Sequence, residues 1–544
     1  MNTMEKVDYI YERLRTQITG KESSITSQSY VFFIFGASGD LAKTKIYPTL
    51  WWLYRDDFLP ENIHFIGYAR SQLTIEKIFE NSHKYMKVKE EEHDIYEKFL
   101  KLNSYISGSY DKSEDFENLN SQANKISHET NSHRIFYLAL PPSVYESASE
   151  LISKHCRPAS PSWLRLIVEK PFGKDLQSSN KLSEHLSKLY TEDEIYRIDH
   201  YLGKEMVQNI LVLRFSNRIF SRVWNRDSIA GVKIIFKEDV GTQGRGGYFD
   251  EFGIIRDVIQ NHLVQILSIV AMEKPRSTTG EDIRDEKVKV LRCIAPIKLE
   301  NVVIGQYIGD KGSTDSEHQL GYLDDKGVPK DSTTPTYAQV VLFIKNERWD
   351  DVPFILRAGK ALNEKTAEIR VQFRDVPGSM FDEELSENGV KERLARDELV
   401  IRIQPDEAIY LKVNTKRPGE MNFGIEKTEL DLTYNERYRG VKLPDAYERL
   451  ILDVFMGSQI NFVRSDELQE AWRIVDPILA EIDKKKLSII PYTFGAIGIR
   501  EAFDAAVTQG FVYTGKNLWK DEPSTSIINS QEDKNNMESH SANT

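Results

Sequence analysis

Short apolar runs alternate with longer amphipathic segments in the first part of the chain, up to about residue 205. Four runs have the composition of buried strands: 31–35 (VFFIF), 63–68 (IHFIGY), 134–140 (RIFYLAL) and 164–169 (LRLIVE). Segments of helical period separate them, among them 73–98 and 143–154. Strands that are apolar on both faces and joined by long crossovers are typical of a parallel sheet covered by helices. The pattern predicts a doubly wound α/β domain over residues 28–204.

The second part of the chain, residues 205–520, is richer in strands. Five runs have strand-like composition: 232–236, 337–344, 369–373, 399–403 and 408–413. Asp406-Glu407, between the last two, predicts a hairpin connection. Two segments, 254–271 and 445–455, have the period of helices. Many consecutive strands with few helices between them predict an α+β domain with a large, mainly antiparallel sheet.

Both ends of the chain lack the apolar residues that a packed element needs. Residues 1–27 close on a polar stretch, and residues 521–544 contain no aromatic residue and are rich in Ser, Asn, Asp and Glu. We therefore expect a flexible N-terminal segment and a disordered C-terminal tail. We expect no signal peptide and no membrane span, because no run approaches about 18 apolar residues.

Charge and cysteine content narrow the classes of protein. The 544 residues carry 72 Lys and Arg against 84 Asp and Glu, a net charge of −12. An acidic chain argues against a nucleic-acid binder and a polybasic membrane anchor, but it is compatible with a local basic pocket. The two cysteines, Cys156 and Cys293, have neither disulfide-framework nor zinc-site spacing. We therefore expect an intracellular protein of enzyme size without a metal site.

A glycine-rich turn follows the first predicted strand. Residues 36–43 read GASGDLAK, so strand, turn and helix follow one another as a dinucleotide-binding site requires. Gly36 permits the tight turn, Gly39 lets a pyrophosphate approach the backbone, and Ala42 takes the close-packing position. The spacing GxxGxxA departs from the usual GxGxxG, so an ordinary βα turn remains the alternative. Pro48, inside the following helix, is expected to kink or delay it.

The end of the second predicted strand indicates which dinucleotide would bind. An acidic residue there accepts hydrogen bonds from the ribose of NAD, whereas an arginine accommodates the 2′-phosphate of NADP. The strand ends in GYAR (67–70), with no acid at that place. Arg70 therefore favours NADP, with a solvated surface arginine as the alternative.

Two later segments are suited to an anionic substrate. Lys170 follows the fourth predicted strand, at the edge where doubly wound sheets bind ligands, and the next residue is a candidate cis proline, Pro171. His200, Tyr201 and Lys204 offer three kinds of donor to a phosphate dianion. Solvated or mutually satisfied surface side chains are the alternative in both segments.

A third segment carries Asp257 and His262 on the predicted helix 254–271. Five residues correspond to about 140° around an α-helix, so the two side chains are not expected to pair, although both could touch one ligand at the helix start. A structural histidine is the alternative for His262.

Several motifs of one family occur here in order. They are GASGDLA (36–42), GYAR (67–70), EKPFG (169–173), RIDHYLGKE (197–205), RGGYFDEFGIIRDVIQNHL (245–263), GKALNE (359–364) and the block 445–474. On these motifs the chain resembles the glucose-6-phosphate dehydrogenases, of the eukaryotic, NADP-dependent type, over about residues 28–520.

The resemblance implies oxidation of β-D-glucose 6-phosphate at C1 by NADP, which yields 6-phospho-D-glucono-1,5-lactone and NADPH. This oxidoreductase reaction of glucose metabolism opens the oxidative pentose phosphate pathway. The resemblance also implies a Rossmann-like coenzyme domain and a β+α domain whose sheet forms a dimer interface. A cytoplasmic homodimer or homotetramer, with no nucleic-acid or membrane partner, is the expected form.

By motif position, the resemblance implies that His262 is the general base and Asp199 its orienting partner, with Lys170 between sugar and cofactor. A neutral imidazole near pH 7 can take the C1 hydroxyl proton as hydride leaves, a contribution of about 10²–10⁴-fold. Asp199 would fix the tautomer and raise the pKa of His262. The implied substrate contacts are Lys170, His200, Tyr201, Lys204, Glu238, Asp257, Lys360, Lys365 and Gln404. The implied cofactor contacts are Gly36, Ala37, Ser38, Gly39, Asp40, Leu41, Ala42, Lys43, Arg70, Tyr145 and Lys170.

Animal-type members of the family carry a second, structural NADP site near the dimer interface. The matching positions here are Arg357, Arg370, Arg402, Tyr410, Lys412, Asp431, Tyr513 and Trp519. Thr366 and Ile497 stand where that site has a lysine and an arginine. Each lost cation makes the free energy of NADP binding at this site less favourable by about 1–3 kcal/mol. Arg500 is near enough in sequence to compensate.

Two other functions are alternatives to this one. A catalytically silent, NADP-binding regulatory protein needs an intact cofactor turn and a damaged chemical centre, whereas Lys170, Asp199 and His262 are all present. A luminal hexose-phosphate relative fused to a lactonase needs a signal peptide and a further domain, and we expect neither.

Overall fold

The computed structural model describes residues 29–126, 132–381, 394–421, 423–438, 444–484 and 487–513. The chain divides into two compact units, each assembled from three stretches. Unit 1 comprises residues 1–208, 268–292 and 438–476, and unit 2 comprises 209–267, 293–437 and 477–544. The expected flexible segment 1–27 and the expected tail 521–544 lie outside the described residues.

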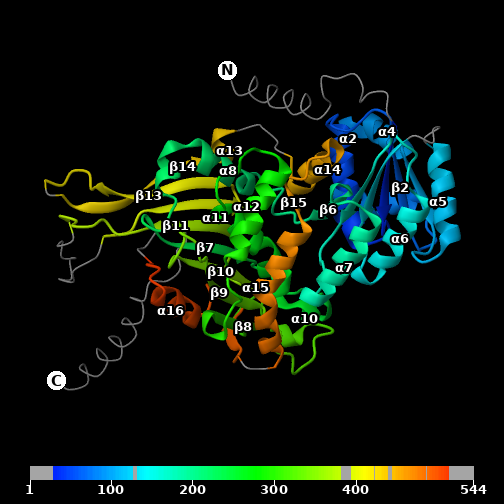
Figure 1. The fold of residues 1–544 in the computed structure, drawn as a ribbon. Coiled ribbons are helices and arrows are strands. Elements are labelled where there is room, and N and C mark those ends of the chain that lie inside the picture. The colour runs from blue at the N-terminus through cyan, green and yellow to red at the C-terminus, as the bar shows by residue number, and fades with distance from the viewer. Residues whose placement is uncertain are drawn as a thin grey trace. The chain divides into compact units, whose positions relative to one another are not determined.

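Unit 1 contains a seven-stranded sheet (Figure 1). Its strands are β1 (Tyr30–Phe35), β2 (Ile63–Ala69), β3 (Asn103–Ser107), β4 (His133–Leu138), β5 (Leu164–Val168), β6 (Ile195–Ile198) and β15 (Phe462–Val463). The order is β15-β6-β5-β4-β1-β2-β3; six strands are parallel and β15 runs antiparallel to β6. This is the order 3-2-1-4-5-6 of a Rossmann sheet, so the predicted doubly wound fold is confirmed. The four predicted strands are present, whereas β3 and β6 were not predicted.

Helices cover both faces of this sheet. On one face lie η1 (Ala42–Ile46), α2 (Tyr47–Arg55), α3 (Ile75–Met86), η2 (Glu90–Glu92), α4 (His93–Lys101) and α14 (Ala446–Met456). On the other, α5 (Ser113–Ile126) packs Phe116 against Phe35 of β1 and is followed by η3 (Pro142–Val144), α6 (Tyr145–His155) and α7 (Leu176–Leu189). The short η4 (Glu192–Glu194) precedes β6. Two apolar layers, one against each face, make the core.

Two helical expectations differ from the structure in detail. The segment of helical period over 73–98 contains separate helices rather than one, because Lys87 takes a left-handed conformation (φ 53°) and ends α3 there. Pro48 does not delay the start of its helix, because the π-helical turn η1 runs directly into α2 and Pro48 lies inside a continuous helical stretch. The wider π-helical turn directly before Pro48 marks the local distortion that a proline causes in a helix.

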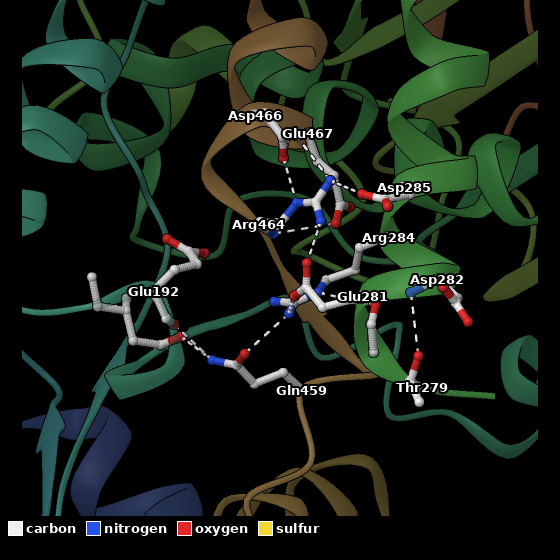
Figure 2. A network of polar contacts seen from close by, with 12 residues as sticks. Glu192, Thr279, Glu281, Asp282, Arg284, Asp285, Gln459, Arg464, Asp466 and Glu467 are labelled. Atoms are coloured by element: carbon white, nitrogen blue, oxygen red, sulfur yellow. Dashed lines mark hydrogen bonds and ion pairs between the residues drawn. The ribbon is translucent and has the colours of Figure 1, made fainter. Parts of the chain in front are cut away.

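A network of charged and amide side chains connects the late segments of unit 1 to its early ones (Figure 2). Arg464 forms ion pairs with Glu281 and Asp285 of α12 (Gly280–Arg292), at 2.8 and 2.6 Å. Gln459 donates hydrogen bonds to the carbonyl oxygens of Glu192 and Ile195, at 2.8 and 3.0 Å. These contacts explain why residues 268–292 and 438–476 belong to unit 1, although residues 205–520 were predicted as one domain.

Unit 2 contains a nine-stranded sheet, drawn in green, yellow and orange in Figure 1. Its order is β14-β13-β12-β11-β7-β10-β9-β8-β16. The strands are β7 (Ile229–Lys237), β8 (Val302–Ile308), β9 (Tyr337–Phe343), β10 (Pro353–Gly359), β11 (Thr366–Phe373), β12 (Glu398–Gln404), β13 (Ala408–Lys416), β14 (Ile425–Thr433) and β16 (Ile490–Thr493). Among the described strands of this sheet only the β7–β10 and β8–β16 pairs are parallel, so the predicted mainly antiparallel sheet is confirmed. Asp406 and Glu407 connect the antiparallel strands β12 and β13, as predicted.

The helix expected over 254–271 consists of a π-helix, Ile255–Leu263, followed by an α-helix, Val264–Ala271. The described helices here are α9 (Arg218–Val223), α10 (Gly246–Ile254), the π-helix η5 (Ile255–Leu263), η6 (Leu299–Asn301), η7 (Tyr322–Asp324), α13 (Tyr434–Arg437) and α16 (Arg500–Thr508). Three more, α8 (Glu205–Ser216), α11 (Val264–Ala271) and α15 (Ser465–Asp483), run from one unit into the other. The helical stretch Gly246–Ala271 has the length and hydropathy of a membrane span, but 83% of its apolar window is buried, as in a core helix.

Candidate active site

The predicted cofactor residues of unit 1 lie at one edge of its sheet, where the parallel strands end. Gly36 follows β1 and takes a left-handed conformation (φ 81°). A Cβ atom at Gly36 would lie 2.2 Å from the carbonyl oxygen of Ala139, which follows β4. Strands β1 and β4 are the pair at which the sheet order reverses, and ligands of doubly wound sheets bind there. Gly36 is therefore required both by its backbone angle and by this close approach.

The rest of the turn is arranged as a backbone cradle. The Gly39 amide donates to the carbonyl oxygen of Gly36 at 2.8 Å, and Ser38, Gly39 and Asp40 are exposed. Lys43 forms an ion pair with Asp40 at 3.0 Å, while Ala37 and Ala42 are buried. An exposed turn of this shape before a helical segment fits a pyrophosphate. Leu41, in contrast, is half-buried and packs on the core of unit 1.

Arg70 follows β2 at the same edge and is exposed. Its guanidinium lies over the ring of Tyr110, 5.7 Å from the ring centroid. The aromatic face holds the cation near the strand end, which is the place of a 2′-phosphate in this fold. Tyr145, predicted to contact the cofactor, is fully buried, and its hydroxyl donates to the carbonyl oxygen of Glu169 at 2.8 Å.

The predicted substrate residues of unit 1 follow β5 and β6 at this edge. Lys170 is half-buried, and the Lys170–Pro171 peptide bond is cis, as anticipated. Asp199 is 2% exposed and directly follows β6; its Oδ1 accepts a hydrogen bond from the Tyr201 amide at 3.0 Å. The Lys204 ammonium lies 5.1 Å from the centre of the Tyr201 ring. The structure therefore brings Asp199, Tyr201 and Lys204 together in one turn.

Close packing against α14 shapes that turn. A Cβ atom at Gly203 would lie 2.5 Å from the carbonyl oxygen of Ala446, the first residue of α14. The ring of Tyr447, the next residue, lies nearly parallel to the His200 imidazole, with 5.8 Å between centroids and 12° between planes. A segment more than 240 residues later in the chain thus supports the predicted phosphate-binding histidine.

Four predicted substrate residues of unit 2 lie at one edge of the nine-stranded sheet. Glu238 follows β7, Lys360 follows the parallel strand β10, and Glu238 and Lys360 form an ion pair. Lys365 precedes β11 and Gln404 ends β12; because β11 is antiparallel to both β7 and β12, these two residues lie at the same edge. Lys365 is exposed, and Lys360 and Gln404 are half-buried.

Asp257 and His262 lie on η5, which packs against β7 and β10. The expectation that they stand about 140° apart is wrong, because η5 is a π-helix rather than an α-helix. Hydrogen bonds in a π-helix join residues five apart, so Asp257 and His262 lie one above the other on the same face. His262 is 2% exposed. Asp199 belongs to unit 1 and His262 to unit 2, so their pairing stays a prediction.

The described residues of the predicted second NADP site share one face of the unit 2 sheet. The register pairs Arg370 with Lys233 of β7 and with Val400 of β12, and Val400 with Tyr410. Directly paired residues, and those two positions further along, point to one side of a sheet. By this rule the face includes Arg357, Arg370, Arg402, Tyr410, Lys412 and Asp431.

The cations on this face already contact protein groups. Arg370 pairs with Glu368 and Glu398 at 2.7 and 3.2 Å. Arg357 is fully buried and donates to the Tyr513 hydroxyl at 3.2 Å. Thr366, which stands where the resemblance implies a lysine, has its hydroxyl 3.4 Å from the carbonyl oxygen of Gln404, and Ile497 is half-buried. Trp519 lies outside the described residues.

A buried carboxyl group beside Lys170 was not among the predicted site residues. Glu169 is 6% exposed, and burial raises the pKa of its carboxyl to about 7. Its partners are Tyr137 of β4 and Tyr447 of α14. An acidic residue at the end of an apolar strand was the available signal in the sequence, but the partner on α14 is too distant in sequence for such a signal to find.

A Rossmann sheet with a glycine cradle at its switch point, and an arginine after its second strand, defines a dinucleotide-dependent oxidoreductase. Two family models match the chain: "Glucose-6-phosphate dehydrogenase, NAD binding domain" over residues 33–209 and "Glucose-6-phosphate dehydrogenase, C-terminal domain" over residues 211–514. The chain belongs to the glucose-6-phosphate dehydrogenase family.

Relatives and solved structures agree with this assignment. The chain is 58% identical over 493 residues to "Glucose-6-phosphate 1-dehydrogenase" of Caenorhabditis elegans, covering 90% of this chain and 93% of that protein. It is 53% identical over 502 residues to "Glucose-6-phosphate 1-dehydrogenase 2" of Mus musculus, covering 92% and 96%. A solved glucose-6-phosphate dehydrogenase in complex with its substrate glucose-6-phosphate matches with a TM-score of 0.83 at 42% identity, covering 91% of this chain and 100% of that one.

Proposed function

We propose that this protein oxidises β-D-glucose 6-phosphate at C1 to 6-phospho-D-glucono-1,5-lactone, with NADP as the hydride acceptor. The observation that carries the proposal is the carboxyl edge of the unit 1 sheet. There the Gly36 cradle, Arg70, Lys170 and the turn after β6 follow strands that end side by side. Membership of the family supports the choice of substrate.

The residues present fit NADP. The left-handed conformation of Gly36 makes the turn tight, and Gly39, which is exposed and has no side chain, leaves the backbone open to a pyrophosphate. Ser38 to Lys43 would hold the pyrophosphate, and Arg70 the 2′-phosphate. When bound, NADP supplies the acceptor for the hydride from C1.

The proton chemistry belongs to the protein. In the proposed mechanism the His262 imidazole accepts the C1 hydroxyl proton as the C–H bond breaks and the carbonyl forms. Asp199 orients the imidazole and stabilises its charged form. His200, Tyr201 and Lys204 bind the phosphate, and Lys365 adds a second cation to it. Glu238, Asp257, Lys360 and Gln404 bind the sugar hydroxyls, and Lys170 lies between sugar and cofactor.

The test is NADPH absorbance at 340 nm on addition of glucose 6-phosphate, with fructose 6-phosphate and galactose 6-phosphate as competitors. We expect turnover with glucose 6-phosphate and a loss of about 10²–10⁴-fold in kcat for His262→Asn. Equal turnover of wild type and variant would remove the general-base assignment. NADP binding without turnover of any hexose phosphate would revive the silent regulatory alternative.

We further propose the setting that the family implies: a cytoplasmic homodimer or homotetramer that opens the oxidative pentose phosphate pathway and supplies NADPH. The one-sided row of cations that includes Arg357 and Arg370 supports a second NADP site on the unit 2 sheet. Equilibrium binding of radiolabelled NADP decides this point, because two NADP molecules per chain are expected with the second site and one without it.

A further inference from the structure

Glu169 directly follows β5, and its side chain turns into the interior of unit 1 rather than toward solvent. The Tyr137 hydroxyl, from the neighbouring strand β4, donates a hydrogen bond to Oε1 of Glu169. The backbone oxygen of Glu169 accepts a hydrogen bond from Tyr145 of α6 at 2.8 Å. The residue before Lys170 is therefore held from two sides by elements of the sheet and its covering helices.

A second phenol reaches the same carboxyl from a remote segment. The Tyr447 phenol, in the first turn of α14, lies beside the Glu169 carboxyl and favours its charged form. Its ring is the one that lies parallel to the His200 imidazole at 5.8 Å. Glu169 thus connects two segments that the proposed function uses separately: the loop that carries Lys170 and the turn that carries His200.

The chemistry of this cluster depends on where its protons lie. The titratable groups that face the Glu169 carboxyl are Tyr137 from β4, Lys170 from its own loop and Tyr447 from α14. Burial raises the pKa of both phenols far above the ordinary value, so both keep their protons and act as donors. The ionised carboxylate can accept from both phenols at once, whereas the neutral acid offers one acceptor fewer and adds a donor.

We propose that Glu169 is a positioning residue for the reaction: its carboxylate, held by Tyr137, fixes Tyr447 against His200 and fixes the backbone that carries Lys170. The inference rests on the proposed function, because His200 and Lys170 matter to it as ligands of sugar phosphate and cofactor. A carboxylate that accepts from Tyr137 and also faces the Tyr447 phenol orders both segments more firmly than the Tyr137 hydrogen bond alone.

The pH profile of kcat/KM for glucose 6-phosphate gives the first test. The Glu169 carboxyl has a pKa of about 7, so wild type is expected to show an ionisation there that strengthens substrate binding as pH rises. Glu169→Gln keeps the shape and removes the charge. It is expected to lose that ionisation and to raise KM for glucose 6-phosphate about tenfold at pH 8, with a smaller change in kcat.

Tyr137→Phe separates this ionisation from that of the general base. The Tyr137 hydrogen bond lowers the pKa of the Glu169 carboxyl, so its removal should move the Glu169 ionisation to higher pH. The ionisation of the general base should stay at the same pH. The control is Tyr190→Phe, which removes another buried phenol hydrogen bond of unit 1, donated to the Ser149 carbonyl oxygen at 2.6 Å, and should leave the profile unchanged.

Tyr447→Phe keeps the ring on His200 but removes the hydroxyl that faces the Glu169 carboxyl. If the two residues act through one another, Glu169→Gln combined with Tyr447→Phe raises KM no more than the stronger single variant does. Three outcomes would each overturn the positioning role. They are fully additive effects of the two substitutions on KM, an unchanged pH profile of kcat/KM in Glu169→Gln, and an ionisation at the same pH in Tyr137→Phe as in wild type.

A spectroscopic arm does not depend on turnover. The ultraviolet difference spectrum between pH 6 and pH 8 should contain a tyrosine component in wild type that Glu169→Gln lacks. If wild type does not reduce NADP with glucose 6-phosphate, the proposed function fails while this spectrum still reports the cluster. If wild type turns over but the tyrosine component is identical in the variant, the positioning inference fails alone.

Discussion

The Glu238 carboxylate and the Lys360 ammonium form an ion pair that joins the ends of the parallel strands β7 and β10. The Glu238 amide donates to the Gly359 carbonyl oxygen at 2.9 Å, so backbone and side chains fix this edge together. Both side chains remain partly accessible, at 25% and 13% of their surface. Such a pair contributes little to stability but presents two opposite charges to a ligand.

Lys360→Gln and Glu238→Gln should therefore act on binding more than on folding. Each is expected to raise KM for glucose 6-phosphate about tenfold, the size of one charge-assisted hydrogen bond, and to lower the free energy of unfolding by less than about 1 kcal/mol. Steady-state kinetics and denaturant unfolding measure the two effects. A loss of several kcal/mol with an unchanged KM would show that the pair is structural.

Arg70→Ala should discriminate between the two nicotinamide cofactors. Arg70 stands after β2, at the place of the 2′-phosphate that NADP carries and NAD lacks. The variant is expected to raise KM for NADP about tenfold or more and to leave KM for NAD nearly unchanged. Equal effects on both cofactors would contradict the assignment. Arg157→Ala, elsewhere on unit 1, removes a surface ion pair with Glu194 and serves as the control.

Gly36→Ala tests the cofactor cradle. The new Cβ would meet the Ala139 carbonyl oxygen at 2.2 Å and would also strain a left-handed backbone. We expect loss of NADP binding and a destabilisation of about 1–3 kcal/mol. Gly378→Ala is the matched control, because Gly378 also has positive φ (63°) but no atom of the described residues lies within 4 Å of its added Cβ. Equal damage in both variants would assign the effect to backbone strain alone.

Lys287 and Glu467 form a buried ion pair between α12 and α15 at 2.6 Å, with 1% and 0% of their side chains exposed. Lys287→Met leaves a buried carboxylate without its cation and should cost about 3–5 kcal/mol in unfolding free energy. The double variant Lys287→Met with Glu467→Leu should regain most of that loss. Denaturant unfolding of the three proteins checks this, and a double variant as unstable as the single one would count against the ion pair.

The Glu169 carboxyl also makes stability depend on pH. Its pKa is raised from an ordinary value of 4.5 to about 7, so between these values the folded protein binds more protons than the unfolded chain. Stability should therefore fall as pH rises from about 4.5 to about 7, by about 3 kcal/mol from this group. Glu169→Gln should flatten the unfolding free energy over this interval. A wild-type profile that rises through it, with no change in the variant, would contradict the prediction.

The hydrophobic pattern was sufficient to predict the two sheets, but it did not predict how distant segments of the chain join them. The runs at 31–35 and 164–169 became β1 and β5 because they are apolar on both faces. Strand β3 (NSYIS) is short and mostly half-buried, so it has no such run. The π-helix η5 has an ordinary amphipathic sequence, and nothing in the period of residues 255–263 distinguishes it from an α-helix.

The site motifs could be predicted from the sequence because they follow strands whose carboxyl ends lie at one edge of a sheet. The contacts that support these motifs could not be predicted, because their partners lie far along the chain. They are Ala446 against Gly203, Tyr447 against His200 and Glu169, and Gln459 against Glu192. A sequence pattern reports local burial, whereas these pairs depend on the folded path of the chain.

The assembly of unit 1 from three separate stretches has a consequence for the order of events at the ribosome. Its first stretch ends at residue 208, but α14, β15 and the first part of α15 belong to the last stretch, which begins at residue 438. At synthesis rates of about 5–20 residues per second, the emerging β6 edge waits on the order of tens of seconds for β15 to pair with it. During that time its unpaired backbone groups are exposed to other nascent chains, so chaperone capture is expected to matter most in this interval.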